Sequence, residues 1–212
     1  MRNTVLFLIV CIGFVAPAKA EIIPMPPELQ AYLMRPEQQK AVVGMMSQQW
    51  KMLMNNCPNP RLENTNVLIS TLPKFNDSGA PISGEWRVIG HVSGCNEIRI
   101  FNILFHFTPE GQMVRTGLLP GTTAASLLLQ HDALKYAVMG MRGLMPAQDC
   151  KDIQFTNTSF EGFDKEPAGN HSSWSEKWIV RTCGVSGVVT LHFIPDKTGT
   201  AIMMDPKETQ RL

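Results

Sequence analysis

The chain contains the same sequence pattern twice, and this internal similarity constrains its fold more than any other feature. Residues 104–110, LFHFTPE, return in similar form as residues 190–196, TLHFIPD, and residues 41–46, AVVGMM, return as residues 137–142, AVMGMR. Self-similarity at a long spacing is typical of tandem structural units. The cysteines fall between these landmarks in the same order in both copies: Cys57 and Cys95 in the first, Cys150 and Cys183 in the second.

The first twenty residues have the pattern of a secretory signal peptide. Arg2 gives a positive start, residues 5–15 are mostly apolar, and residues 18–20 read A-K-A, a cleavage signal. The apolar stretch is too short to span a bilayer, and no later stretch approaches about 18 apolar residues. We therefore expect residues 1–20 to be removed and the mature chain to be exported, to the periplasm or the extracellular space, with no membrane span.

The charge balance excludes some partners. The full chain of 212 residues has a formal charge of +1, and loss of Arg2 and Lys19 with the signal peptide changes it to −1. A nearly neutral chain without a basic run does not match the electrostatic pattern of a protein whose main partner is nucleic acid or an anionic membrane. We expect neither.

The four mature cysteines predict two disulfides. Three pairings of four cysteines are possible, and an ancestral unit with two cysteines would pair internally. Duplication of such a unit gives Cys57–Cys95 and Cys150–Cys183, which close loops with separations of 38 and 33 residues. Each bridge contributes up to about 4 kcal/mol in the loop-entropy picture. Zinc is the alternative, but the C-x₂-C spacing of zinc sites is missing.

Hydrophobic periodicity gives each copy one helix followed by four strands. Apolar residues three and four apart indicate helices that end shortly before Cys57 and Cys150, and alternating β-branched and aromatic residues indicate the strands that follow. We expect the second helix to start after a cap at Thr122 or Thr123, with Leu127 and Leu128 on its apolar face. The predicted fold class is α+β, a tandem duplication of a helix plus a four-stranded antiparallel sheet, with one disulfide per repeat. We interpret residues 21–36 as an extended N-terminal segment with a short helix expected over residues 28–34, 37–118 as repeat 1, 119–122 as a linker, 123–204 as repeat 2, and 205–212 as a charged, frayed C-terminal tail.

Two histidines, His106 and His192, occupy the same place in the repeated motif. Neighbouring residues of a strand point to opposite faces, so Phe105 and Phe193 face the core while both histidines turn away from it. The two could meet about a pseudo-twofold axis, but a metal site needs a third ligand, and no spacing supplies one. We interpret them as hydrogen-bonded strand residues with a tentative binding role, and we assign no metal and no cofactor.

Methionines gather on the two predicted helices, where a thioether could fill the core or hold Cu(I) in an oxidising compartment. Their helical spacing favours core packing. The methionines concerned are Met45, Met46, Met52, Met54, Met139, Met141 and Met145.

No nucleophile motif is complete in the sequence. Residues 184–187 read GVSG and lie at a strand end, so a hydrolase stays only an alternative.

Trp174 is the candidate for a partner-binding residue. We place it in a long polar loop, residues 161–175, that has no counterpart in the first repeat, and we match Trp178 with Trp86 as a structural pair. Aromatic residues in polar loops are common contact residues at protein interfaces. We therefore expect Trp174 to be at least partly exposed.

The helix-plus-four-strand unit resembles the layout of cystatin-type repeats and of secreted β-lactamase-inhibiting proteins. Residues 88–90, VIG, are similar to the end of the cystatin hairpin signature, but Trp86 stands where that signature has glutamine, so inhibition of papain-type proteases is not implied. A shared layout carries little information on function.

The sequence thus favours a secreted or periplasmic binding protein that is not an enzyme. In the first hypothesis it binds or inhibits another exported protein through its hairpin and long loops. In the second it carries a small apolar ligand, or Cu(I), in a methionine-lined pocket, and in the third it is a hydrolase with an unrecognised site. Surplus volume between helix and sheet would favour the carrier.

Overall fold

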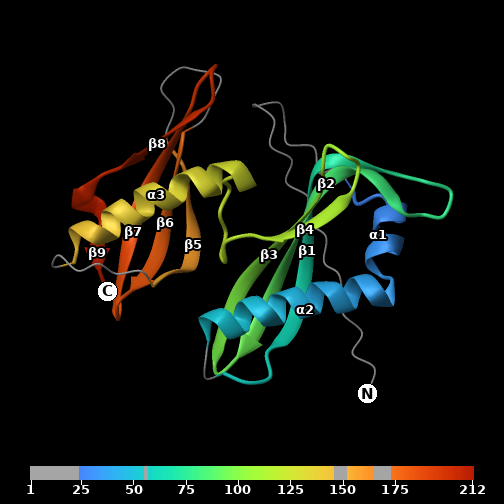
Figure 1. Ribbon diagram of the computed structural model, residues 1–212, viewed down its shortest axis with the longest axis horizontal. Helices are drawn as coiled ribbons and strands as arrows, with labels where there is room; N and C mark the ends of the chain where they lie inside the picture. Colours follow the sequence, from blue (N-terminus) through green and yellow to red (C-terminus); the bar gives the residue numbers. More distant parts are fainter. Residues whose placement is uncertain (1–23, 55–56, 146–151, 165–172) are drawn as a thin grey trace. The chain divides into compact units, whose positions relative to one another are not determined.

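The computed structural model describes residues 24–54, 57–145, 152–164 and 173–212. The chain divides into two compact units, Met1–Leu118 and Leu119–Leu212. Each unit combines a long helix with its own antiparallel sheet, and the helix covers one face of that sheet (Figure 1). The predicted α+β class is confirmed.

Unit 1 is a meander of four strands with two helices. Proline occupies the first helical position of both helices, where its missing N–H costs no hydrogen bond. The strands are arranged in the order β1-β2-β3-β4, all antiparallel. The elements are α1 (Pro27–Leu33), α2 (Pro36–Leu53), β1 (Arg61–Phe75), β2 (Pro81–Gly94), β3 (Glu97–Phe107) and β4 (Met113–Gly117).

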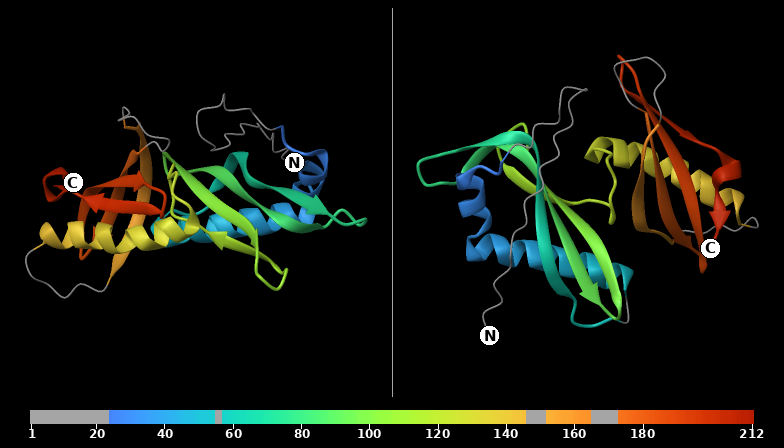
Figure 2. Two further views of the ribbon diagram at one scale, coloured as in Figure 1. Left: turned by 90° about the horizontal axis from the view of Figure 1, so that it is seen from above. Right: turned by 180° about the vertical axis from the view of Figure 1, so that it is seen from behind.

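Unit 2 repeats this order with one helix and an additional short strand (Figure 2). The strands β5 to β8 form an antiparallel meander, and β9 pairs with β7. The helix begins after Ser126, whose side chain accepts a hydrogen bond from the Leu129 N–H as an N-cap. The elements are α3 (Leu127–Gly143), β5 (Ile153–Phe163), β6 (Trp174–Thr182), β7 (Val185–Pro195), β8 (Thr200–Met204), a 3₁₀ turn (Pro206–Glu208) and β9 (Gln210–Arg211).

The turn between the second and third strand of each sheet gives a common reference point for the two units. In unit 1 it is formed by Cys95 and Asn96, with φ of 48° and 65°, and in unit 2 by Cys183 and Gly184, with φ of 46° and 74°. Two successive residues with positive φ are the mark of a two-residue type I′ hairpin turn. Residues can therefore be compared by their distance from the turn cysteine.

This register corrects the predicted pairing of the tryptophans. Trp86 lies nine residues before Cys95 and pairs with Phe105, while Trp174 lies nine residues before Cys183 and pairs with Phe193. Both rings stack on their partners, with centroids 5.2 Å and 4.9 Å apart. Trp174 is thus the first residue of β6 and the counterpart of Trp86, so the prediction of an unmatched loop residue is wrong.

Trp178 instead corresponds to Gly90, which likewise lies five residues before its turn cysteine. In unit 1 the sheet has no side chain here because Met46 of α2 packs on Gly90, where an added Cβ would lie 2.5 Å from the Met46 Cε. In unit 2 the sheet supplies the large Trp178, and α3 presents small residues to the core, including Ala133 and Ala137. The large side chain at this level thus comes from the helix in unit 1 and from the sheet in unit 2, and each core is filled there.

The same register places the repeated motifs two residues apart. His192 lies nine residues after Cys183, but His106 lies eleven residues after Cys95. An even shift keeps both histidines on the face away from the helix, as predicted, although they are not equivalent positions.

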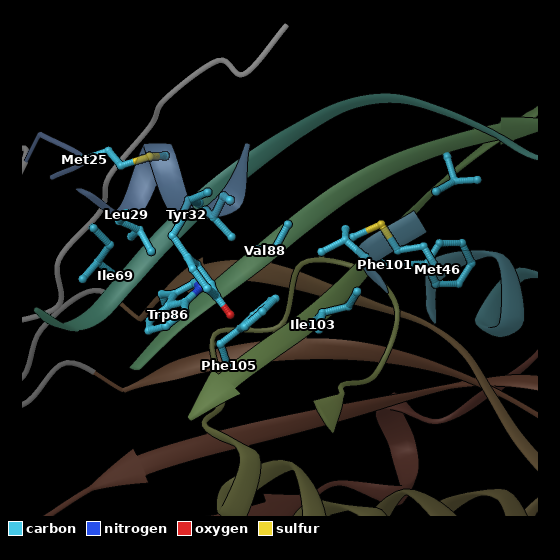
Figure 3. Close-up of a cluster of buried hydrophobic side chains, with 14 of the residues drawn as sticks. Met25, Leu29, Tyr32, Met46, Ile69, Trp86, Val88, Phe101, Ile103 and Phe105 are labelled. Carbon is cyan, nitrogen blue, oxygen red and sulfur yellow. The ribbon is translucent and has the colours of Figure 1, made fainter. Parts of the chain in front are cut away.

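The core of unit 1 lies between α1, α2 and one face of the sheet. Trp86 is next to Tyr32 of α1 and stacks on Phe105, and Phe101 and Ile103 continue the same buried row along β3 (Figure 3). Burial of Phe105 and Phe193 is confirmed. Phe107 is only partly buried, because it lies at the end of β3, where it packs against the margin of the core.

The short helix expected within the N-terminal segment is present, whereas two predictions about the helix of unit 2 are wrong. Residues 27–33 form α1, close to the predicted residues 28–34, and this helix buries Leu29 and Leu33. The helix of unit 2 starts at Leu127 rather than near residue 123, and its predicted apolar face is exposed at Leu128 (72% exposed). Its buried face includes the small residues Ala133, Ala137 and Gly140, together with Gln130 and Met141.

The segments at both ends of unit 2 are ordered rather than loose. The predicted linker belongs to unit 2: Gly121 forms a parallel bridge with Thr158 of β5. The predicted frayed tail contains β9, and Thr209 within it is buried. Pro120 and Gly121 in the first segment and Thr209 in the second are buried, which charge content alone does not indicate.

The Cys57–Cys95 disulfide is confirmed, with the two Cα atoms 5.9 Å apart. It joins the end of α2 to the β2–β3 turn, and the buried Trp50 indole N–H donates to the Cys57 carbonyl oxygen at 3.1 Å. Cys150 lies outside the described residues, so the Cys150–Cys183 bridge stays a prediction.

Candidate functional site

The β1–β2 hairpin is the longest in the protein's described part, and its tip projects beyond α1 (Figures 1 and 2). The turn is closed by Asn76, whose side-chain oxygen accepts hydrogen bonds from the backbone N–H groups of Ser78 and Ala80 at 3.1 Å and 2.9 Å. Such a side-chain turn holds the tip in one conformation without help from the core.

Arg35, at the corner between α1 and α2, connects the hairpin tip to the helices. Its Nη2 donates to the carbonyl oxygens of Ser78 and Gly79 at 3.0 Å and 2.8 Å, and its guanidinium lies over the Tyr32 ring, 5.5 Å from the centroid. Burial, the largest effect on this phenol, raises the pKa of Tyr32 above its ordinary value. The two Arg35 hydrogen bonds therefore hold the tip against the corner of the helices.

The outer part of the hairpin exposes aliphatic side chains. Leu72 is 54% exposed and Ile82 is 53% exposed, and the register between β1 and β2 shifts three times between Ile69 and Phe75. Such irregularities twist a strand away from flat pairing with other sheets. A braced hairpin with exposed aliphatic residues can bind an apolar protein surface.

Unit 2 contains a buried carboxylate that sequence reasoning misses. Glu176 is 0% exposed, and its oxygens accept hydrogen bonds from the indole N–H groups of Trp174 at 3.0 Å and Trp178 at 2.8 Å. The backbone N–H of Ala124 is a third donor, at 2.9 Å. The alternation W-x-E-x-W in residues 174–178, on one face of a strand, is the sequence signal that could have revealed it.

This cluster joins the segment before α3 to the sheet. Thr158 of β5 donates from both its N–H and its hydroxyl to the Pro120 carbonyl oxygen, each at 2.8 Å, and the Thr122 N–H donates to the Thr158 carbonyl oxygen. Glu176 holds Ala124 further along the same segment. The carboxylate therefore has an evident structural role.

The surroundings of Trp174 are aromatic. Trp174 pairs across the strands with Phe163, which is half exposed, and the Phe163 ring lies 5.2 Å from that of Phe160. Trp174 itself is partly buried by its stacking on Phe193. Residues 165–172 of the predicted loop lie outside the described residues, and a binding role for Trp174 stays a prediction.

Each histidine has a partner within its own unit. His106 Nε2 lies 3.1 Å from the Thr116 Oγ1 on β4, and His192 Nε2 lies 2.6 Å from a carboxylate oxygen of Glu208. Neither histidine is part of a larger ligand set: the described residues contain no group of three or more His, Cys, Asp or Glu side chains that could hold a metal. Their tentative binding role stays a prediction.

The methionines that the structure describes lie in different environments. Met46 and Met141 are buried in the cores of different units, while Met52 and Met139 are exposed. A cavity of about 60 Å³ does lie between α2 and the sheet of unit 1, but valine and leucine side chains form most of its lining, with Gln39 and Thr65 as its polar members.

Comparison with known proteins gives no relative: no protein-family model, no curated protein and no solved structure matches this chain. Within the described residues, no helix has both the length and the apolar character needed to cross a membrane. The functional proposal therefore rests on the geometry of the chain itself.

Proposed function

We propose that this chain is an exported binding protein, not an enzyme, that holds another exported protein on the outer part of its β1–β2 hairpin. The observation that carries the proposal is the exposure of Leu72 and Ile82 on a hairpin that Arg35 and Asn76 hold in place. A hairpin that is ordered beforehand loses little conformational entropy on binding.

The proposal includes the origin of the two units. We propose that they are copies of one ancestral unit, each closed by its own disulfide. The support is the shared element order, the shared type I′ turn at the second cysteine and the equivalent stacked pairs, Trp86 on Phe105 and Trp174 on Phe193. The signal-peptide pattern and the Cys57–Cys95 bridge support an oxidising, exported location.

The carrier of a small apolar ligand is the second candidate, because unit 1 has space between helix and sheet. That space is about 60 Å³, whereas pockets that enclose a whole ligand hold roughly 300–1,000 Å³. The cavity can accept one side chain but cannot enclose a ligand. The geometry therefore favours the protein binder.

The test is capture of the partner by hairpin variants. The double substitution Leu72→Ser/Ile82→Ser should lower recovery of the native partner from the exported compartment at least about tenfold, since each side chain would lose roughly 1.5–3 kcal/mol of apolar burial. Stability should change by less than about 0.5 kcal/mol per site, because both residues are exposed.

Ile98 provides the matched control. It is an aliphatic residue of the same unit, 69% exposed, at the start of β3 beside the β2–β3 turn. Ile98→Ser should leave capture unchanged. Equal loss with Ile98→Ser, or no loss with the hairpin variant, would contradict the proposal.

A further inference from the structure

The cavity of unit 1 lies in the groove between α2 and β1, an edge strand of its sheet. Its walls are apolar except for Gln39 and Thr65, and the apolar members are Leu33 of α1, Val42 and Val43 of α2, Leu62 of β1 and Val88 of β2. Val43 is 43% exposed, so the cavity reaches the surface along the groove. We refer to this place as the α2–β1 groove.

One polar atom in this groove has no partner among the described residues. Thr65 is 1% exposed, lines the cavity, and its Oγ1 makes no hydrogen bond. A buried hydroxyl without a partner costs free energy, and most such groups in proteins are satisfied. The unpaired hydroxyl therefore points to a missing hydrogen-bonding group.

Unit 2 shows what occupies the equivalent position there. Thr65 pairs with Gly90 and Thr158 pairs with Trp178, and both of these partners lie five residues before their turn cysteine, so the two threonines are equivalent. The Thr158 hydroxyl is not unpaired: it donates to the Pro120 carbonyl oxygen at 2.8 Å.

A second wall of the cavity has the same correspondence. Val88 and Glu176 each lie seven residues before the turn cysteine, and Glu176 accepts from the Ala124 N–H. Two residues that line the cavity in unit 1 thus correspond to the two that hold residues 120–124 in unit 2. In unit 2 the chain's own segment supplies hydrogen-bond partners at these two positions, whereas in unit 1 a cavity bordered by Leu33 of α1 lies beside them and the Thr65 hydroxyl has no partner.

We propose that the α2–β1 groove binds an extended segment of a partner protein. One aliphatic side chain of that segment enters the cavity, and a backbone carbonyl oxygen accepts the hydrogen bond of the Thr65 hydroxyl, as the Pro120 carbonyl does for Thr158. This refines the proposed function and rests on it, since the segment would belong to the partner that the hairpin holds.

The lining determines which side chain fits. The described residues that form the cavity wall carry no charge, so a charged side chain would lose its hydration without gaining an ion pair. The volume of about 60 Å³ is well below the roughly 150 Å³ of an engineered cavity that binds benzene, so an aromatic ring is too large. Valine and leucine fit.

The experiment measures binding of capped pentapeptides, Ser-Thr-X-Thr-Ser, to the isotopically labelled mature chain by NMR. With X as leucine or valine, the Thr65 and Val88 amide signals should shift, and binding should be about tenfold tighter than with alanine because more apolar area is buried. The phenylalanine peptide should bind no tighter than the alanine peptide.

Two variants separate groove binding from other causes. Val42→Phe should fill the cavity and abolish the preference for leucine, and Thr65→Val should weaken binding several-fold without lowering the unfolding midpoint, since it removes an unpaired hydroxyl. Leu72→Ser/Ile82→Ser should leave peptide binding unchanged, so failure of the hairpin proposal and failure of this one are distinguishable.

Several results would overturn the proposal. These are no binding of any peptide at millimolar concentration, shifts located outside the groove, a preference for phenylalanine, or wild-type binding by Thr65→Val. Shifts at Thr65 that depend on protein concentration without peptide would assign the groove to a second copy of this chain, and would overturn it as well.

Discussion

Glu176 supports a sharp prediction, because its burial depends on hydrogen bonds alone. The carboxylate is fully buried, and the ion pairs identified among the described residues do not include it. Its three donors are the indoles of Trp174 and Trp178 and the backbone N–H of Ala124. Glu176→Ala removes the acceptor of all three.

The three donors set the magnitude. A buried donor left without a partner costs about 1–3 kcal/mol. Trp178 is fully buried and should lose the most, whereas Trp174 and Ala124 are only partly buried and can regain water. Removing the carboxylate also removes its own desolvation cost. We expect a net loss of about 3–5 kcal/mol, which is large against a typical stability of about 5–15 kcal/mol. Glu176→Gln, which keeps one acceptor oxygen, should lose less.

Hydrogen exchange read by mass spectrometry is the assay, because it reports on the two units separately. Glu176→Ala should speed exchange in β5, β6 and residues 119–126 while leaving β1 to β4 nearly unchanged. Val88→Ala, at the equivalent place in unit 1, is the control and should cost no more than about 2 kcal/mol, since it removes only methyl groups. A cost below about 1 kcal/mol for Glu176→Ala would refute the claim that the carboxylate holds the segment.

Four further predictions concern single contacts. Gly121→Ala should destabilise unit 2 by at least about 2 kcal/mol in urea unfolding, because φ is +106° and an added Cβ would lie 2.5 Å from the Thr158 nitrogen. The control Gly111→Ala, at φ of +78° in open space, should lower the stability of unit 1 by only about 1 kcal/mol. Equal losses of stability would contradict this reasoning. Cys95→Ala should lower the stability of unit 1 by about 2–4 kcal/mol, given a closed separation of 38 residues, and an unchanged unfolding midpoint would contradict this. Peptide mapping of the mature chain should recover Cys150–Cys183, and recovery of Cys183 with any other cysteine would disprove one bridge per unit. Two groups lower the pKa of the Glu161 carboxyl: first the Lys177 ammonium, 2.8 Å away, and then the Ser159 hydroxyl. Their stabilising effect is present at neutral pH and is lost as the pH falls through that lowered pKa. Lys177→Met should raise this pKa towards 4.5 in an NMR titration, and an unchanged value would refute the assignment.

Sequence periodicity is sufficient for the α+β class and the order of the elements, because helices and strands each bury one face with their own period. It fails where the large core side chain comes from the helix in one unit and from the sheet in the other, as with Met46 and Trp178. Similarity of the motifs pairs Trp178 with Trp86, whereas the turn cysteines set the true register, with Trp174 opposite Phe193. Periodicity also places the exposed Leu128 in the core, because it shows that an apolar stripe exists but not whether small residues such as Ala133 and Ala137 are buried instead.

The site is less accessible from sequence than the fold. Turn residues make the hairpin a candidate, but the brace from Arg35 depends on contacts with residues 43 and 44 positions away along the chain. The Thr65 hydroxyl and the Glu176 carboxylate are ordinary strand residues in the sequence. Their roles emerge only when strand pairing shows which residues of the two units are equivalent.

The most direct test of the binding function is site-specific photo-cross-linking in the producing cells. A benzophenone amino acid replaces Ile82 in one strain and Ile98 in another, since both side chains are exposed on the same unit. We predict one discrete adduct with an exported protein from position 82 and none from position 98. The same adducts from both positions, or no adduct from position 82, would contradict the binding function.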